Sequence, residues 1–146
     1  MKKYILIFGL FLIAQNVIAN DKDFLINRQF MKLMTSEYIF RAYNKSECGH
    51  FVEGNSEPVE YMHKSIEELK NQLSETQKEN LQNELGPNNE AVANEGNRWF
   101  KRNLNHFKKT IKNKDFMCGV TFGSLISILQ RFEQKRIKLH LKINSK

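Results

Sequence analysis

The stretch DFLINRQFMKLMTSEYIFRAYN, residues 23–44, decides the fold because its apolar side chains recur mostly at intervals of three and four residues. That spacing places them on one face of an α-helix, which must be covered by other elements. Asp21 or Asp23 is available as an N-terminal cap. A helix over residues 23–44 is therefore expected. Its apolar face contains Phe24, Ile26, Phe30, Leu33, Met34, Ile39 and Phe40.

The next helix has clear start and stop signals. Ser56 can cap it, and Pro58 fits its first turn, where a missing backbone N–H costs nothing. Gly86-Pro87 stops it, because glycine favours a helix end and proline cannot continue the hydrogen-bond ladder. A single helix is expected over residues 56–85.

Two more helices complete an all-α bundle of about four helices. The third is expected from residue 88 or 89 to about residue 112, and Asn113-Lys114-Asp115 is interpreted as a break. The fourth carries apolar residues from position 120 to position 139, after which the chain should fray. Because apolar and polar residues alternate over positions 139–143, a short terminal strand is the alternative.

Cys48 and Cys118 are the two cysteines of the chain. In an oxidising compartment two cysteines most often pair. In an up-down-up-down bundle the first and third links lie at the same end; Cys48 falls in the first link and Cys118 at the start of the fourth helix. This predicts a Cys48–Cys118 disulfide. The alternative is a zinc site that combines both thiolates with His50 and with His63 or His106.

Residues 1–19 have the features of an export signal. Two lysines precede an apolar run over residues 4–14, which is shorter than the roughly 20 residues that a membrane span needs. Cleavage is expected after Ala19, with a retained signal anchor as the alternative. The mature protein, residues 20–146, is then a single helical domain in the periplasm or outside the cell.

No catalytic site is predicted. The chain lacks HExxH, CxxC, GxSxG and glycine-rich phosphate-loop motifs. A small hydrolase would need His50 or His106 to meet carboxylates in the folded chain. A b-type haem would need Met31 or Met34 together with His140. Catalytic residues, metals and cofactors are therefore all predicted to be absent.

Charge is distributed unevenly along this chain of formal net charge +7. Residues 53–84 contain eight glutamates and three lysines, whereas residues 98–114 contain seven basic residues and no acid. The two segments either neutralise each other as adjacent antiparallel helices, or the second presents a basic face beside Trp99-Phe100 to an acidic protein partner. Nucleic acid is not expected as a partner of an exported protein without a nucleic-acid motif.

The basic end of the chain offers a further possible contact, with an anionic membrane surface. The side chains available for it are Arg131, Lys135, Arg136, Lys138, Lys142 and Lys146.

The segment CGVTFGSLISILQRF, residues 118–132, resembles part of the Rap1a/Tai-type immunity proteins. The residues that match are Cys118, Val120, Thr121, Gly123, Leu125 and Phe132. Members of that family are small exported helical proteins that protect a bacterium from peptidoglycan-cutting effectors of type VI secretion. The resemblance implies stoichiometric plugging of an effector's active site in the periplasm. It covers 15 of 146 residues, and the proline that usually separates the cysteine from the glycine is missing here.

We predict an exported, non-enzymatic protein-binding protein, with an immunity or inhibitor role as the specific hypothesis. An envelope chaperone that binds unfolded clients and a small hydrolase are the alternatives. The candidate contact residues are His50, Phe51, Trp99, Lys101, Arg102, Lys108 and Lys109. Reversing the four basic members of this set to glutamate should abolish partner binding without unfolding the domain.

Overall fold

The computed structural model describes residues 2–50 and 56–145. Its elements are α1 (Lys2–Asn44), α2 (Ser56–Lys70), α3 (Glu75–Leu85), the short 3-10 helix η1 (Pro87–Asn89), α4 (Glu90–Thr110) and α5 (Lys114–Asn144). These described residues contain no strand, so the all-α prediction is confirmed. Because α5 continues as a helix to Asn144, the alternative of a terminal strand is wrong.

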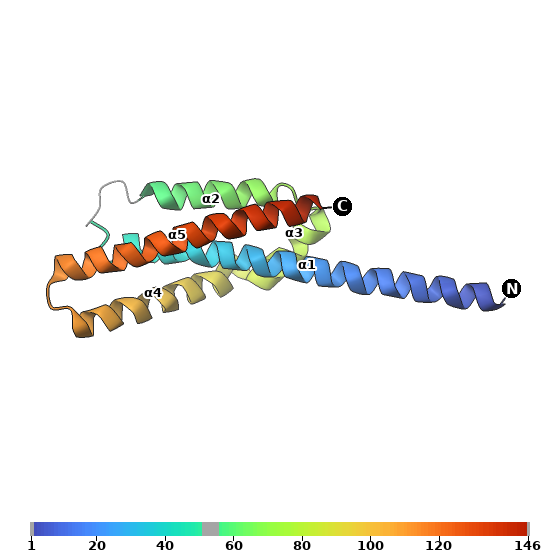
Figure 1. The fold of residues 1–146 in the computed structure, drawn as a ribbon, viewed down its shortest axis with the longest axis horizontal. Helices are drawn as coiled ribbons and strands as arrows, with labels where there is room; N and C mark the ends of the chain where they lie inside the picture. The colour runs from blue at the N-terminus through green and yellow to red at the C-terminus, as the bar shows by residue number, and fades with distance from the viewer. Residues whose placement is uncertain (1, 51–55, 146) are drawn as a thin grey trace.

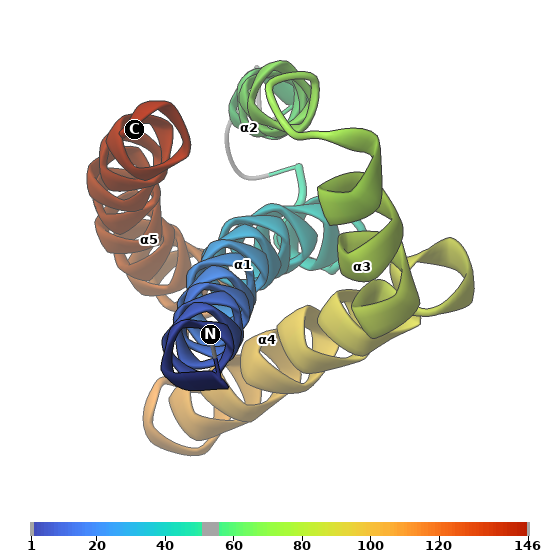
Figure 2. The same cartoon turned by 90° about the vertical axis from the view of Figure 1, so that its right-hand side faces the viewer.

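Helix α1 forms the centre of the bundle. It packs against α2, α3, α4 and α5, and Figure 2 shows the other helices arranged around it. In Figure 1, α1 and α4 run in one direction and α2 and α5 in the other. The short helix α3 lies between α2 and α4, at the end of the bundle opposite the turn from α4 to α5. The up-down-up-down order is therefore present, with one short helix inserted.

The core follows the apolar face that the sequence predicts for α1. Phe30 and Leu33 of α1, Met62 of α2 and Phe132 of α5 are completely buried. Burying side chains of this size contributes roughly 1.5–3 kcal/mol each. Three residues that the sequence places on apolar faces are instead exposed: Phe24, Ile126 and Ile137.

The N-terminal part of α1 projects beyond the other helices in Figure 1. The predicted signal, residues 1–19, precedes Ile26, where the described core begins. Its removal would leave that core intact, and the cleavage stays a prediction. Among the described residues, none of the helices combines the length and the apolar character needed to cross a membrane.

The predicted second helix is wrong in its length, since it is two helices separated by a turn. Helix α2 ends at Lys70, and α3 begins after Ser74. The Ser74 hydroxyl accepts a hydrogen bond from the backbone N–H of Gln77 at 3.3 Å, and the Gln77 side chain accepts one from the N–H of Ser74 at 3.1 Å. This capping box gives α3 a start signal of its own. Leu73 is buried and anchors the turn in the core.

The predicted start of the first helix is wrong, because α1 runs without a break from Lys2, so Asp21 and Asp23 lie inside the helix and do not cap it. The remaining predicted boundaries agree with the structure to within a few residues. Helix α3 ends before Gly86, whose φ of 72° suits glycine. Helix α5 begins at Lys114, earlier than expected, because the Asn113 side chain accepts a hydrogen bond from the backbone N–H of Phe116 at 2.8 Å. Cys118 therefore lies in the second turn of α5, near the start of that helix as expected.

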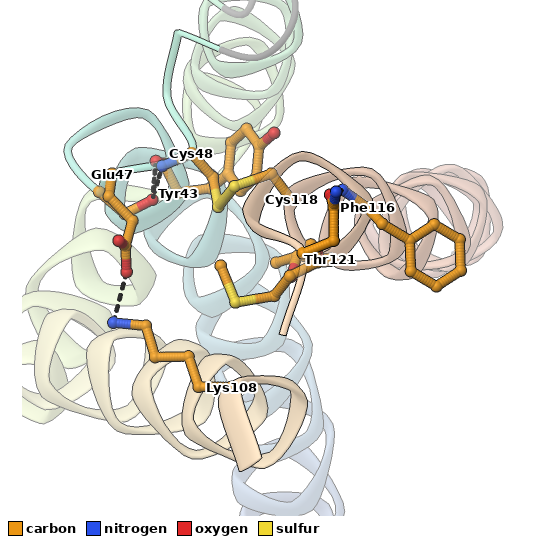
Figure 3. The surroundings of a disulfide bond; sticks show 10 residues. Tyr43, Glu47, Cys48, Lys108, Phe116, Cys118 and Thr121 are labelled. Atoms are coloured by element: carbon orange, nitrogen blue, oxygen red, sulfur yellow. Dashed lines mark hydrogen bonds and ion pairs between the residues drawn. A yellow bond between two sulfur atoms is a disulfide. The ribbon is translucent and has the colours of Figure 1, made fainter. Parts of the chain in front are cut away.

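The predicted disulfide is present. Cys48 and Cys118 are joined, with their Cα atoms 5.2 Å apart, and both residues are buried. Figure 3 shows the bond linking the turn after α1 to the start of α5. It joins positions 70 residues apart in the sequence. The bond engages both sulfur atoms, so the zinc alternative, which needs two free thiolates, is wrong.

Candidate functional site

The disulfide end of the bundle is rigidly packed. The Tyr43 ring contacts Phe100 of α4 and Phe122 of α5, with centroids 6.2 and 5.9 Å apart. Burial raises the pKa of the Tyr43 phenol. Nearby, Lys108 forms an ion pair with Glu47 (Figure 3), and this hydrogen bond is the main reason why the pKa of the Glu47 carboxyl is lowered. These contacts fix the C-terminal part of α4 relative to the end of α1.

The first two predicted contact residues belong to this end. His50 is exposed in the turn that follows Cys48. Phe51 lies outside the described residues. Since Glu47 contacts Lys108, the segment that carries His50 begins beside the C-terminal part of α4. No contact described for His50 joins it to the remaining predicted residues.

The other predicted contact residues lie on α4, four of them on its exposed surface. We define the basic face as Arg98, Lys101, Arg102, Lys108 and Lys109. Arg98 and Arg102 share the Glu95 carboxylate at 3.1 and 3.7 Å. Among the described residues, neither Lys101 nor Lys109 has a carboxylate within ion-pair distance. The basic face therefore keeps a net positive charge.

The expectation that the acidic helices neutralise this face is wrong. Figure 2 shows α2 and α4 on opposite sides of α1. Within residues 2–50 and 56–145, no ion pair joins α4 to α2 or α3. The glutamates of α2 and the cations of α4 are thus presented to solvent on different sides of the molecule.

The aromatic pair at the start of the basic run is divided between two environments. Phe100 is 4% exposed and belongs to the core. Trp99 is half-buried and lines a groove of about 260 Å³ between α1, α4 and α5. We call it the cationic groove; its lining residues are Lys32, Thr35, Ser36, Ile39, Glu95, Trp99, Ile128, Arg131 and Lys135.

Three cations from two helices converge on the cationic groove. Lys32 comes from α1, and Arg131 and Lys135 come from α5. Burial lowers the pKa of the Lys135 ammonium, and the positive charges of Lys32 and Arg131 lower it further. In the part of the chain that the structure describes, none of the three has a carboxylate at ion-pair distance. Glu95, the acid in the lining, is already engaged by Arg98 and Arg102.

Sequence reasoning missed this groove. It assigned Arg131 and Lys135 to a basic chain end suited to a membrane surface, and it gave Lys32 no role. The local sequence carries no signal for the grouping, because nearly a hundred residues separate Lys32 from Arg131. Arg136, from the same basic end, instead forms an ion pair with Glu133 at 3.0 Å.

A buried carboxylate links α1 to α2. Glu37 is 4% exposed. Its Oε1 atom accepts hydrogen bonds from Arg41 and lies 3.4 Å from His63 Nδ1. Because Arg41 neutralises this carboxylate, we assign the cluster a structural role. Among the described residues, no group of three or more His, Cys, Asp or Glu side chains is arranged to hold a metal ion.

This cluster gives a stability prediction. Arg41→Ala should lower the free energy of unfolding by about 1–3 kcal/mol, because it leaves a buried carboxylate poorly compensated. Urea denaturation measures the loss. Arg28→Ala is the matched control, since Arg28 is exposed on the same helix and should tolerate the change within about 0.5 kcal/mol. Equal stability of the two variants would contradict the structural role of the cluster.

Comparison with known proteins assigns neither a family nor a function to this site. None of the family models, characterised proteins or solved structures compared with the chain matches it. The candidate site is therefore defined by the chain's own residues. It consists of the basic face of α4 and the adjoining cationic groove, which meet at Glu95.

Proposed function

We propose that this is an exported protein that binds one acidic protein partner through the basic face of α4 without turning over a substrate. The observation that carries the proposal is the net positive charge of that face, on the side of α1 opposite the acidic helix α2. Complementary charge of this kind speeds association and selects against wrong partners.

The rigidity of the site supports a binding role. The basic face lies on a regular helix that packs against α1 over much of its length. The Lys108–Glu47 pair joins its C-terminal end to the turn after α1, which the disulfide in turn links to α5. A surface that is already ordered loses little conformational entropy on association. Arginine and tryptophan, which recur as anchors of protein interfaces, are both present at Arg102 and Trp99.

Within this class, an immunity or inhibitor role in the periplasm is the specific proposal. The disulfide is the chemistry of an oxidising compartment. The segment that resembles the Rap1a/Tai-type immunity proteins forms the first half of α5. Its matching residues Thr121, Leu125 and Phe132 are buried. They would maintain the fold, while exposed residues elsewhere would contact the effector.

The test is capture of partners by the immobilised chain, expressed from its full sequence in an exporting host and kept oxidised. Envelope and secreted fractions of the source cell are the samples. We expect one protein, bound at a fixed ratio, whose affinity falls at least about tenfold between about 50 and about 500 mM salt. Many weakly bound proteins at variable ratios would contradict the proposal.

A second candidate is binding of unfolded clients. The observation that favours it is a set of exposed apolar side chains along α5, namely Phe116, Ile126, Ile137 and Leu141. Exposed apolar surface of this kind is used for contact with other proteins. An assay of client aggregation separates the two functions, since only a client-binding protein should suppress aggregation of an unrelated unfolded protein.

A further inference from the structure

The cationic groove brings like charges together at a cost to the fold. Lys32, Arg131 and Lys135 all line this space; Lys32 and Arg131 are exposed, whereas Lys135 is partly buried and is the cation on which the repulsion from the other two acts most strongly. No carboxylate of the described residues offsets them at ion-pair distance. An anion in the groove would relieve this repulsion. Arg131 Nε donates to the backbone carbonyl of Ser127 at 3.1 Å, but none of the three cations has an ion-pair partner among the described residues, so the groove suits an anionic ligand.

We propose that the cationic groove receives an acidic segment of a protein partner, with a carboxylate among the three cations and a neighbouring apolar side chain against Trp99. This inference deepens the proposed function and rests on it for the nature of the partner. It adds a second contact site on α1 and α5, which the basic face of α4 does not include.

The residues that line the groove explain why the proposed ligand carries both a carboxylate and an apolar side chain. Ile39, Trp99 and Ile128 contribute apolar area beside the cations. An aliphatic or aromatic side chain packed there is removed from water, with a gain of about 25 cal/mol per Å² of buried apolar area. The carboxylate of the same segment gains charge-assisted hydrogen bonds from arginine or lysine. A simple inorganic anion would use only the second of these contributions.

The size of the groove suits side chains of a protein partner. Its volume is about 260 Å³. One or two side chains fill such a space. The groove also adjoins the basic face, since Glu95 lines the groove and a shallow hollow beside Arg98, Lys101 and Arg102. A partner bound on the basic face could thus extend into the groove.

Binding in the groove can be followed by intrinsic fluorescence. Trp99 is the single tryptophan of the chain, so a change in its emission reports on the groove without a label. The probe is the peptide acetyl-Gly-Leu-Glu-Leu-Gly-amide, titrated into the oxidised full chain. We expect a saturable change in Trp99 emission at millimolar peptide. The same peptide with glutamine in place of glutamate should bind at least about fivefold more weakly, because it lacks the charge.

Two double variants locate the binding. Lys32→Gln with Lys135→Gln should weaken the acidic peptide about tenfold. Lys45→Gln with Lys64→Gln is the matched control; both lysines are exposed outside the groove, and affinity should not change. The groove variant should also melt at or above the wild-type temperature, because it removes repulsion. A binding loss that came from misfolding would instead lower the melting temperature.

The outcomes separate this inference from the proposed function. No saturable response, equal binding of both peptides, or unchanged affinity in the groove variant would overturn the groove proposal. If the partner captured by the wild-type chain is captured equally well by the groove variant, the groove proposal fails while the proposed function stands. If the peptide binds as expected but the envelope and secreted fractions yield no partner, the proposed function fails instead.

Discussion

Replacing both cysteines by alanine is expected to lower the free energy of unfolding by about 4 kcal/mol. The Cys48–Cys118 bond joins positions 70 residues apart, and in the loop-entropy model closing a loop of that length raises the free energy of the unfolded state by about this much, because it removes conformational entropy. A loss of this size is a large share of the stability of a small domain. The melting temperature should fall by roughly 15 °C. Urea and thermal unfolding of the oxidised chain and the variant measure both effects.

A reducing agent provides the control for the disulfide prediction. The wild-type chain with reductant should match the Cys48→Ala, Cys118→Ala variant, and the variant itself should not respond to reductant. The loss is also expected to release the turn after α1 from α5, since the bond is the covalent link between them. A difference of less than about 1 kcal/mol between oxidised chain and variant would contradict the role of the bond as the main constraint on the unfolded state.

Gly96→Ala is expected to destabilise the protein by about 2 kcal/mol, although alanine is the better helix former. Gly96 is buried where α4 crosses α1. A Cβ atom there would lie 2.7 Å from the Cβ of Tyr38 and 3.1 Å from the backbone N of Ile39. Neither atom is the end of a flexible side chain, so the two helices must separate, and overpacking of this kind costs about 1–3 kcal/mol. Equilibrium urea unfolding measures the change.

Gly123 of α5 is the matched control for Gly96. An added Cβ at Gly123 meets no atom within 4 Å, and the residue is exposed. Gly123→Ala should therefore stabilise the protein by up to about 1 kcal/mol through helix propensity alone. The two substitutions make the same chemical change with opposite expected signs. Destabilisation by both, or by neither, would contradict the close approach of α1 and α4.

The periodicity of the sequence was sufficient to predict the fold class and the disulfide. The spacing of the apolar residues from Phe30 to Phe40 indicates the buried face of α1, because side chains on one face of an α-helix recur about every 3.6 residues. The stop at Gly86 follows from its backbone conformation. The pairing of Cys48 with Cys118 followed from topology, since antiparallel helices bring alternate links to one end.

The sequence did not predict where helices break or meet. The turn after Lys70 depends on a Ser74–Gln77 capping box that lies within a stretch of helical composition. The separation of α2 from α4 depends on how the helices pack around α1, which local charge does not encode. The cationic groove depends on the same packing, because its residues come from α1, α4 and α5. Tertiary contacts decided the last two features, whereas the capping box is a local signal that the sequence contains.

The central claim is that the basic face binds the partner, and capture with charge-reversed chains tests it most directly. Lys101→Glu with Lys109→Glu reverses the two α4 lysines that have no ion-pair partner among the described residues, and it leaves the Lys108–Glu47 pair intact. Lys64→Glu with Lys138→Glu makes the same change in charge at exposed positions of α2 and α5. Circular dichroism verifies that both variants are folded. We predict that the α4 variant binds the captured partner at least about tenfold more weakly than the wild-type chain, while the control keeps its affinity. Equal affinity of all three chains would contradict the claim.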